Sequence, residues 1–295
     1  MNNKKSFILG ISAILFWSTV ATAFKFALNN LNYIQTIFYS VLFSTLIIFV
    51  YLVIEKKQSQ LFQFTLKQYF FSAFLGFLNP FLYYLILLKA YSLLPAQLAQ
   101  PLNYTWPIML VLLSVPLLKK KLKKIDLIGI MVSFSGVIFI SLKDNFSFNN
   151  IEEPFGIMLA TGSSIIWALF WIYNLKDDRD VVVKLFLNFL FGLIFITITI
   201  FVTDNFIIPT KEGLNSTLYI SFFEMGITFI LWLTALKLST SQEKLSNLVY
   251  ISPFLSLIFI TIFLHENIYS TTYIGLSLIV LGIFVQNIFS KKNQF

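Results

Sequence analysis

Long stretches without a charged residue dominate this chain. None of them alternates strictly between apolar and polar positions, as the strands of a membrane barrel would. About 20 apolar residues in a helix cross the ~30 Å hydrocarbon layer, so the pattern predicts an all-α polytopic membrane protein with ten transmembrane helices and short connections. The charge-free stretches are Ser6–Phe24, Tyr33–Ile54, Gln68–Leu88, Ala90–Leu118, Leu127–Leu142, Pro154–Leu175, Leu185–Thr203, Leu245–Leu264 and Asn267–Ser290, and a tenth, Gly213–Leu236, carries the single charge of Glu224.

Composition supports the same class. Of 295 residues, 58% are hydrophobic and only 12% are charged, against about 45–50% and about 25% in soluble domains. An ordinary soluble enzyme is therefore excluded. The chain has no cysteine, so disulfide and thiol chemistry are excluded as well.

The first stretch has a second interpretation as a signal peptide. Met1–Lys5 is basic, and Ala21–Ala23 resembles a signal-peptidase site. However, the apolar run is longer than the 7–15 residues typical of a signal peptide. We therefore expect a retained helix.

The basic residues predict an orientation. With the N-terminus inside, only Lys25, Lys89, Lys143 and Lys211 fall on the outer side, which leaves 17 of the 21 Lys and Arg residues inside. The positive-inside rule then places both termini in the cytoplasm and the protein in the cytoplasmic (inner or plasma) membrane. We therefore interpret the net charge of +8 as evidence for contact with membrane lipids and not with nucleic acid.

The two halves of the chain repeat one another at an offset of 146 residues. We therefore divide the chain into residues 1–150 and 151–295. Five helices per half is an odd number, so the second half enters the membrane upside down. Such inverted repeats are common in secondary transporters, which bind their solute near the midplane. The matching pairs are Pro107 and Pro253, Gly129 and Gly275, Gly136 and Gly282, and Gly10 and Gly156.

These residues resemble the EamA-type carriers of the drug/metabolite transporter superfamily. In the first half the resemblance lies in Ala90 to Pro107, followed by Gly129 and Gly136, although Lys120 stands where the second half has Glu266. It implies ten helices and the transport of small organic solutes, often the export of metabolites or amino acids. The second half carries it in Ala235-Leu236-Lys237, Pro253, His265-Glu266, Gly275 and Gly282.

Glu224 is the strongest single candidate for a functional residue. An ionisable group inside a membrane helix costs about 2.5–3.5 kcal/mol or more and usually faces a cavity or a partner. Asn79 occupies the equivalent position in the first half. Glu224 is read as a ligand for a substrate amine or as a carboxylate that carries a proton. The alternative is structural, as an ion pair with Lys89 or a satisfied hydrogen bond.

A polar stripe is predicted on the helix that follows Pro95. Gln97, Gln100, Asn103 and Tyr104 recur at steps of three, three and one, which places most of them on one helical face. They are candidates for binding a polar organic solute, or alternatively for holding helices together. In the second half, Asn247 and Tyr250 form a weaker copy of the stripe, together with Ser246.

Aromatic residues inside the spans add further candidates for the substrate site. Trp17 and Trp171 can wall a cavity, and Tyr83 shares the helical face of Asn79. For each tryptophan, ordinary packing is the alternative. We expect Lys25 and Lys89 to extend toward the headgroups.

The sequence therefore predicts a secondary carrier for a small-molecule substrate, not an enzyme, without cofactor or metal, as a monomer or a homodimer. The substrates considered are small organic metabolites, including amino acids and related amphipathic solutes. Alternatives are a carrier of a lipid-linked or sugar-phosphate solute, an intramembrane enzyme, and a non-transporting sensor or assembly protein.

Overall fold

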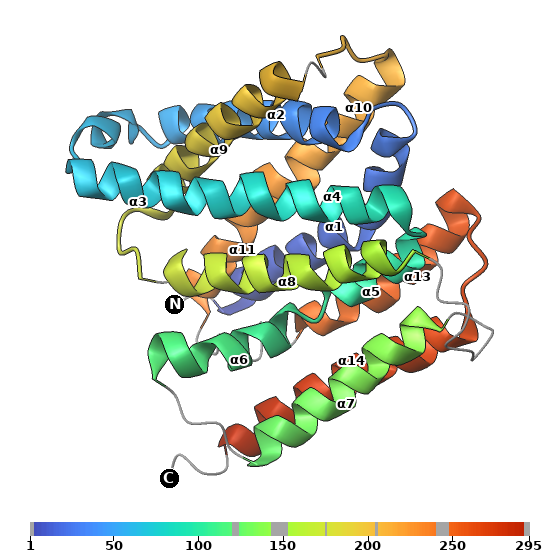
Figure 1. Cartoon of the computed structure of the whole chain (residues 1–295). Coiled ribbons are helices and arrows are strands. Elements are labelled where there is room, and N and C mark those ends of the chain that lie inside the picture. The colour runs from blue at the N-terminus through green and yellow to red at the C-terminus, as the bar shows by residue number, and fades with distance from the viewer. Residues whose placement is uncertain are drawn as a thin grey trace.

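The computed structural model of the chain describes residues 3–119, 124–142, 153–174, 176–203, 206–239 and 248–291. Every regular element in these ranges is helical, and none of them contains a strand (Figure 1). The elements are α1 (Asn3–Leu28), α2 (Tyr33–Ile54), η1 (Gln58–Phe62), α3 (Leu66–Gly76), η2 (Phe77–Leu82), α4 (Tyr83–Leu93), α5 (Ala96–Asn103), α6 (Trp106–Leu118), α7 (Lys124–Ser141), α8 (Pro154–Asn174), α9 (Val181–Thr203), α10 (Lys211–Ile220), η5 (Ser221–Gly226), α11 (Ile227–Leu238), η6 (Leu248–Ile251), α13 (Ser252–Leu264) and α14 (Ser270–Lys291).

The predicted membrane class is confirmed. Eight helical segments in the described residues are long and apolar enough to cross a membrane, and Leu248–Leu264 and Ser270–Val285 are shorter apolar helices. Large apolar side chains such as Met131, Ile198 and Phe201 are exposed on the outside of the bundle, as expected where lipid is the solvent. The eight segments are Lys4–Leu28, Tyr33–Ile54, Leu66–Leu93, Ala96–Leu118, Lys124–Ser141, Pro154–Asn174, Val181–Thr203 and Lys211–Leu236.

One predicted boundary is wrong. The sequence analysis divided two spans at Lys89, but α4 continues through this residue to Leu93. The break comes at Pro95, which precedes α5 and lacks the N–H that would continue the helix. Pro107 lies in the first turn of α6, a position where proline suits a helix start.

One π-helical turn interrupts the third long helix in each half of the chain. In the first half, η2 separates α3 from α4 and contains Asn79 and Pro80. In the second half, η5 separates α10 from α11 and contains Glu224. Such turns leave the regular α-helical hydrogen-bond pattern and occur frequently at functional sites. The two polar residues singled out from the sequence therefore lie at the two irregular points of long helices.

The α7–α14 pair shows how close the helices approach (Figure 1). A Cβ atom built on Gly136 would overlap the carbonyl oxygen of Gly275, and one on Gly282 would overlap that of Gly129. Ser133 Oγ donates a hydrogen bond of 3.0 Å to the Ile279 carbonyl between these contacts. Along this series of contacts the residue numbers rise on α7 and fall on α14, so the two helices are antiparallel. Small residues permit this approach, as in other membrane helix pairs.

The remaining helices pair mainly across the two halves of the chain. α4 packs on α8 and α1 packs on α11, while α6 contacts α8 and α1 contacts α13. α2 packs on α9, where the rings of Phe49 and Phe186 are 5.4 Å apart. The first and second halves therefore interlock instead of forming two separate bundles, and α1, α4, α8 and α11 come together around the middle of the molecule.

We predict that Gly136→Ala destabilises the protein by about 1–3 kcal/mol, the usual cost of adding atoms to a full interface. Gly162→Ala is the matched control, because a Cβ on this glycine of α8 meets nothing within 4 Å. The control should be neutral or slightly stabilising, since alanine favours a helix over glycine. Thermal unfolding of the detergent-solubilised variants measures both effects. Equal melting temperatures would contradict the close α7–α14 contact.

Candidate functional site

Glu224 forms a direct link between the two halves of the chain. Its side chain is buried, with 7% relative exposure, and Tyr84 Oη of α4 donates a hydrogen bond of 2.9 Å to Glu224 Oε1. The ion pair with Lys89 considered above does not form, because the Lys89 ammonium lies over the Tyr33 ring, 5.0 Å from its centroid. The partner of the carboxylate is therefore a neutral phenol.

Asn79 lies in the corresponding turn of the first half, η2, but unlike that of Glu224 its side chain has no hydrogen-bond partner. Its side chain is fully buried, and neither the oxygen nor the nitrogen of its amide has a hydrogen-bond partner. The Asn79–Pro80 peptide is cis, and the Asn79 backbone is extended at φ −151° and ψ 122°. A buried amide without partners retains its full capacity to donate and accept hydrogen bonds.

Tyr83 and Asn103 form a second polar group beside Tyr84. The rings of Tyr83 and Tyr84 are 4.7 Å apart. Tyr83 Oη donates to Asn103 Oδ1 at 3.1 Å, and Asn103 Nδ2 donates to Ser163 Oγ at 2.8 Å. Residues from α4, α5 and α8 thus share one chain of hydrogen bonds close to Glu224.

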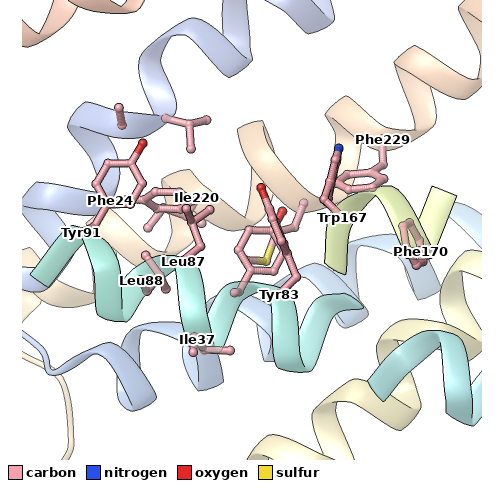
Figure 2. Packing of buried hydrophobic residues seen from close by; sticks show 14 of the residues in the cluster. Phe24, Ile37, Tyr83, Leu87, Leu88, Tyr91, Trp167, Phe170, Ile220 and Phe229 are labelled. Atoms are coloured by element: carbon pink, nitrogen blue, oxygen red, sulfur yellow. The ribbon is translucent and has the colours of Figure 1, made fainter. Parts of the chain in front are cut away.

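Aromatic rings extend from this polar centre. Figure 2 shows Tyr83 of α4, Trp167 of α8 and Phe229 of α11. The Trp167 ring lies 4.5 Å from that of Tyr83 and 5.8 Å from that of Phe229. Trp17 lies 6.4 Å from Phe229, and Trp171 lies 5.8 Å from Trp167. These rings form an apolar wall next to the carboxylate, a combination that suits a solute with a polar and an apolar part. We call Glu224, Tyr84, Tyr83, Asn103 and Trp167 the central site.

The rest of the predicted stripe has other partners. Gln97 lies at the start of α5, where its Nε2 donates to the Asn267 carbonyl at 2.9 Å and its Oε1 accepts from the Tyr269 N–H at 2.8 Å. Gln97 therefore binds the α13–α14 connection and not the central site. Gln100 is buried, and its Oε1 has no partner.

Tyr104 and Tyr250 occupy equivalent positions in the two halves. The Tyr104 hydroxyl is hydrogen-bonded with Ser252 of α13, and the Tyr250 ring packs 5.8 Å from that of Phe284. Asn247 and Ser246 lie outside the described residues.

Lys25 and Glu266 hold the corner between α4 and α5. The prediction that Lys25 extends toward the headgroups is wrong, because its Nζ donates to the carbonyls of Tyr91 at 2.8 Å and Leu94 at 2.7 Å. Glu266 accepts from the N–H groups of Ala96 at 2.9 Å and Gln97 at 3.2 Å. A cavity of about 530 Å³ opens beside these residues. Its lining residues, which include Pro95 and Asn267, lie at the ends of helices, and Glu224 is not one of them.

Sequence reasoning missed several residues of this region. It selected Tyr83 for the face of Asn79, whereas its neighbour Tyr84 is the residue that binds Glu224. It also missed Ser163 and Asn188, and Asn188 is fully buried with an unpartnered amide. Asn188 is a single amide within the apolar run from Leu185 to Thr203, a signal of the same kind as Glu224. No group of three or more metal-ligating side chains occurs in the described ranges.

Comparison with known proteins agrees with this architecture. The EamA-like transporter family matches residues 4–142 and 154–288. An uncharacterized transporter, YvbV, of Bacillus subtilis (strain 168) is 28% identical over 221 residues, which are 74% of this chain and 71% of YvbV. Another from the same organism, YoaV, is 22% identical over 96% of this chain and 97% of its own length. The fold is also similar to that of a protein solved by crystallography. The similarity extends over the whole of both chains, with a TM-score of 0.70 and 18% sequence identity.

The long apolar helices define the class as an integral membrane protein. The chain belongs to the EamA-like transporter family, which confirms the resemblance stated from the sequence. The family and the matched relatives are named as transporters, so the prediction that the chain is not an enzyme is also confirmed.

We predict that Tyr84→Phe lowers the free energy of unfolding by about 1–3 kcal/mol, because it leaves the buried Glu224 carboxyl without its donor. Tyr33→Phe is the matched control, since it removes a hydroxyl and keeps the ring that Lys89 covers. Chemical or thermal unfolding in detergent compares the two. A loss for Tyr84→Phe no larger than that for Tyr33→Phe would refute a stabilising role for the hydrogen bond.

Proposed function

We propose that this protein is a secondary carrier that moves small organic metabolites across the cytoplasmic membrane by alternating access. The observation that carries the proposal is the Glu224–Tyr84 hydrogen bond. It joins a π-helical turn of the second half to a helix of the first half, deep in a bundle whose family members are named as transporters.

The proposed scaffold has ten transmembrane helices in two inverted repeats, residues 1–150 and 151–295. Eight apolar segments and two shorter apolar helices support this count. The contacts support the repeat as well: α4 on α8 corresponds to α11 on α1, and α6 on α8 corresponds to α13 on α1. α6 and α13 also end alike, with the left-handed residues Lys119 and His265, which are 146 positions apart.

An inverted repeat supplies alternating access through a simple physical argument. Two halves of similar fold can exchange conformations, and the exchange turns an inward-open arrangement into an outward-open one. A solute held where the halves meet then changes sides without a continuous pore. Glu224 lies at such a place, because its hydrogen bond crosses from one half to the other.

In this mechanism Glu224 has one of two roles, as a ligand for a substrate cation or as a proton carrier. The aromatic wall of Trp167 and Phe229 takes the apolar part of the solute. Tyr83 and Asn103 present further hydrogen-bonding groups beside it. An amphipathic solute such as an amino acid or a related metabolite fits this combination of groups.

We expect purified protein in liposomes to show saturable counterflow with at least one member of a panel of labelled amino acids and amphipathic metabolites. Glu224→Gln should reduce that transport about tenfold or more while the melting temperature is retained, because glutamine can neither titrate nor balance a cation. Glu212→Gln is the matched control, since Glu212 is an exposed carboxylate in the first turn of α10. Wild-type transport by Glu224→Gln would reject the assignment of Glu224. Absence of counterflow with every solute would argue against a carrier.

We propose that both termini are cytoplasmic. The chain contains no native cysteine, so single cysteines at Asn2 and Gln294 report topology directly. An impermeant maleimide should label both in inside-out vesicles and neither in right-side-out vesicles. Labelling of the two termini from opposite sides would exclude the even number of spans.

A further inference from the structure

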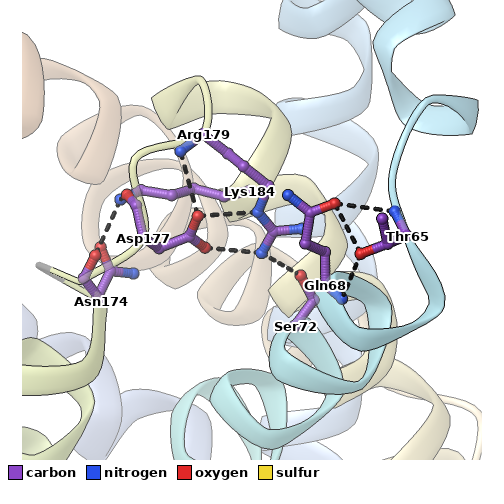
Figure 3. A network of polar contacts seen from close by, with 7 residues as sticks. All are labelled: Thr65, Gln68, Ser72, Asn174, Asp177, Arg179 and Lys184. Atoms are coloured by element: carbon purple, nitrogen blue, oxygen red, sulfur yellow. Dashed lines mark hydrogen bonds and ion pairs between the residues drawn. The ribbon is translucent and has the colours of Figure 1, made fainter.

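The connection between α8 and α9 forms a charged contact with α3 (Figure 3). Arg179 Nε donates to Asp177 Oδ1 at 2.8 Å and Nη2 donates to Asp177 Oδ2 at 2.7 Å, a bidentate pair. The same Nη2 donates to Ser72 Oγ of α3 at 2.7 Å. The guanidinium also lies over the Phe64 ring, 5.0 Å from its centroid. One arginine of the second half thus binds two residues of the first half.

A second ion pair lies in the same connection. Lys57 lies just after α2, and its Nζ is 2.9 Å from Asp180 Oδ2. Partial burial alone would raise the pKa of the Asp180 carboxyl, but the hydrogen bond and charge of Lys57 and the N–H groups of Val182 and Val183 hold it below its usual value. The carboxylate is therefore ionised at neutral pH. We call Lys57, Ser72, Asp177, Arg179 and Asp180 the latch.

Just inside the latch, α3 and α9 touch backbone to backbone. A Cβ atom on Gly76 would overlap the Asn188 carbonyl oxygen, and one on Gly192 would overlap the Pro80 ring. Gly76 lies one helical turn beyond Ser72 of the latch, at a spacing of four residues. The latch therefore sits at the end of the α3–α9 crossing, where it holds the two helices together.

The same crossing buries two amides without partners. Asn79 and Asn188 are both fully buried, and all four polar atoms of their side chains lack a hydrogen bond within the described residues. An unmade hydrogen bond in an apolar interior destabilises the state that contains it. The closed crossing is thus favoured by the latch and disfavoured by the two amides.

We propose that the latch and the two unpartnered amides form a two-state gate at this end of the bundle. When the latch is released, α3 and α9 separate, and Asn79 and Asn188 gain hydrogen bonds with water or with a neutral polar group of the solute. The assignment of this gate to a solute path rests on the proposed function. The gate itself is a property of the fold and is measured without transport.

The opposite end of the bundle differs in chemistry. There the α9–α10 connection meets α2 through the rings of Phe38 and Phe206, 6.4 Å apart, and through Tyr39 Oη, which donates to the Ile207 carbonyl at 2.7 Å. On this proposal the latch biases the protein toward the state that is closed at its own end of the bundle.

Cysteine labelling in detergent tests the gate, because a protein without native cysteine reports only the introduced thiol. Leu185→Cys is the gate reporter: Leu185 is 1% exposed and lies seven residues, two turns, before Gly192 on the same face of α9. Ile140→Cys, fully buried on α7, reports global unfolding. Gln63→Cys is exposed and normalises reagent activity.

We expect Asp180→Asn to raise the labelling rate of Leu185→Cys about two- to fivefold, as for a partly exposed ion pair, and Arg179→Gln to raise it more. Lys57→Glu should raise the labelling rate at least as much as Asp180→Asn, because it removes the same ion pair. Adding Asp180→Asn to Lys57→Glu should give no further increase. Lys56→Glu, the same charge change at an exposed neighbour, should have no effect. Asn188→Leu should slow labelling in each background, because it removes one amide that favours opening.

Unchanged labelling in Arg179→Gln and Asp180→Asn would overturn the gate, as would an equal increase in Lys56→Glu. Parallel increases for Leu185→Cys and Ile140→Cys would also overturn it, because they indicate global unfolding. Counterflow distinguishes the two proposals. Altered labelling together with an absence of transport would reject the carrier and retain the gate. Transport together with unaltered labelling would reject the gate and retain the carrier.

Discussion

Short polar side chains that hydrogen-bond between helices hold this bundle together. In hydrocarbon no water satisfies a buried hydroxyl, so each one needs a partner within the protein. Ser6 Oγ donates to the Ala235 carbonyl at 2.8 Å, Ser221 Oγ donates to the Ser40 carbonyl at 2.9 Å, and Thr105 Oγ1 donates to Ser164 at 3.0 Å. Each of these bonds joins the first half of the chain to the second. Neither half has its polar groups satisfied without the other.

Because buried polar groups need partners within the protein, the groups that have few or none stand out. Glu224 has one donor from Tyr84, whereas the amides of Asn79 and Asn188 have none. In a bundle where most buried hydroxyls are bonded, these exceptions mark places where another conformation, water or a solute completes the bonding. Asn79 and Glu224 lie in the π-helical turns, where the long helices are interrupted. Asn188 lies on the continuous helix α9, which packs against the first of these turns.

Much of the architecture was predictable from local pattern. Charge-free stretches located the helices, and the 146-residue repeat singled out the four glycines at which α7 and α14 approach one another. The helix break at Pro95 was misplaced at Lys89, because a charge was taken as a boundary although proline controls the backbone. Glu224 was found because it is a lone charge in an apolar run.

The partners of these residues were not predictable in this way. Tyr84 lies 140 residues from Glu224, and Ser72 lies 107 residues from Arg179. Such contacts follow from how helices cross, which hydrophobic periodicity does not encode when both faces of a helix are apolar. Tyr83 and Tyr84 are chemically alike and adjacent, so only the rotation of α4 decides which phenol reaches the carboxylate.

The α7–α14 contact also has a consequence for ancestry. Gly136 meets Gly275 and Gly129 meets Gly282, and a shift of 146 residues converts each contact into the other. A surface that pairs with its own equivalent is isologous, the kind of interface that two identical subunits form around a twofold axis. Under the inverted repeats proposed above, a five-helix chain inserted in both orientations would form this interface with a second copy of itself. The seam between α7 and α14 is thus what an antiparallel homodimer would leave behind after its two genes had joined.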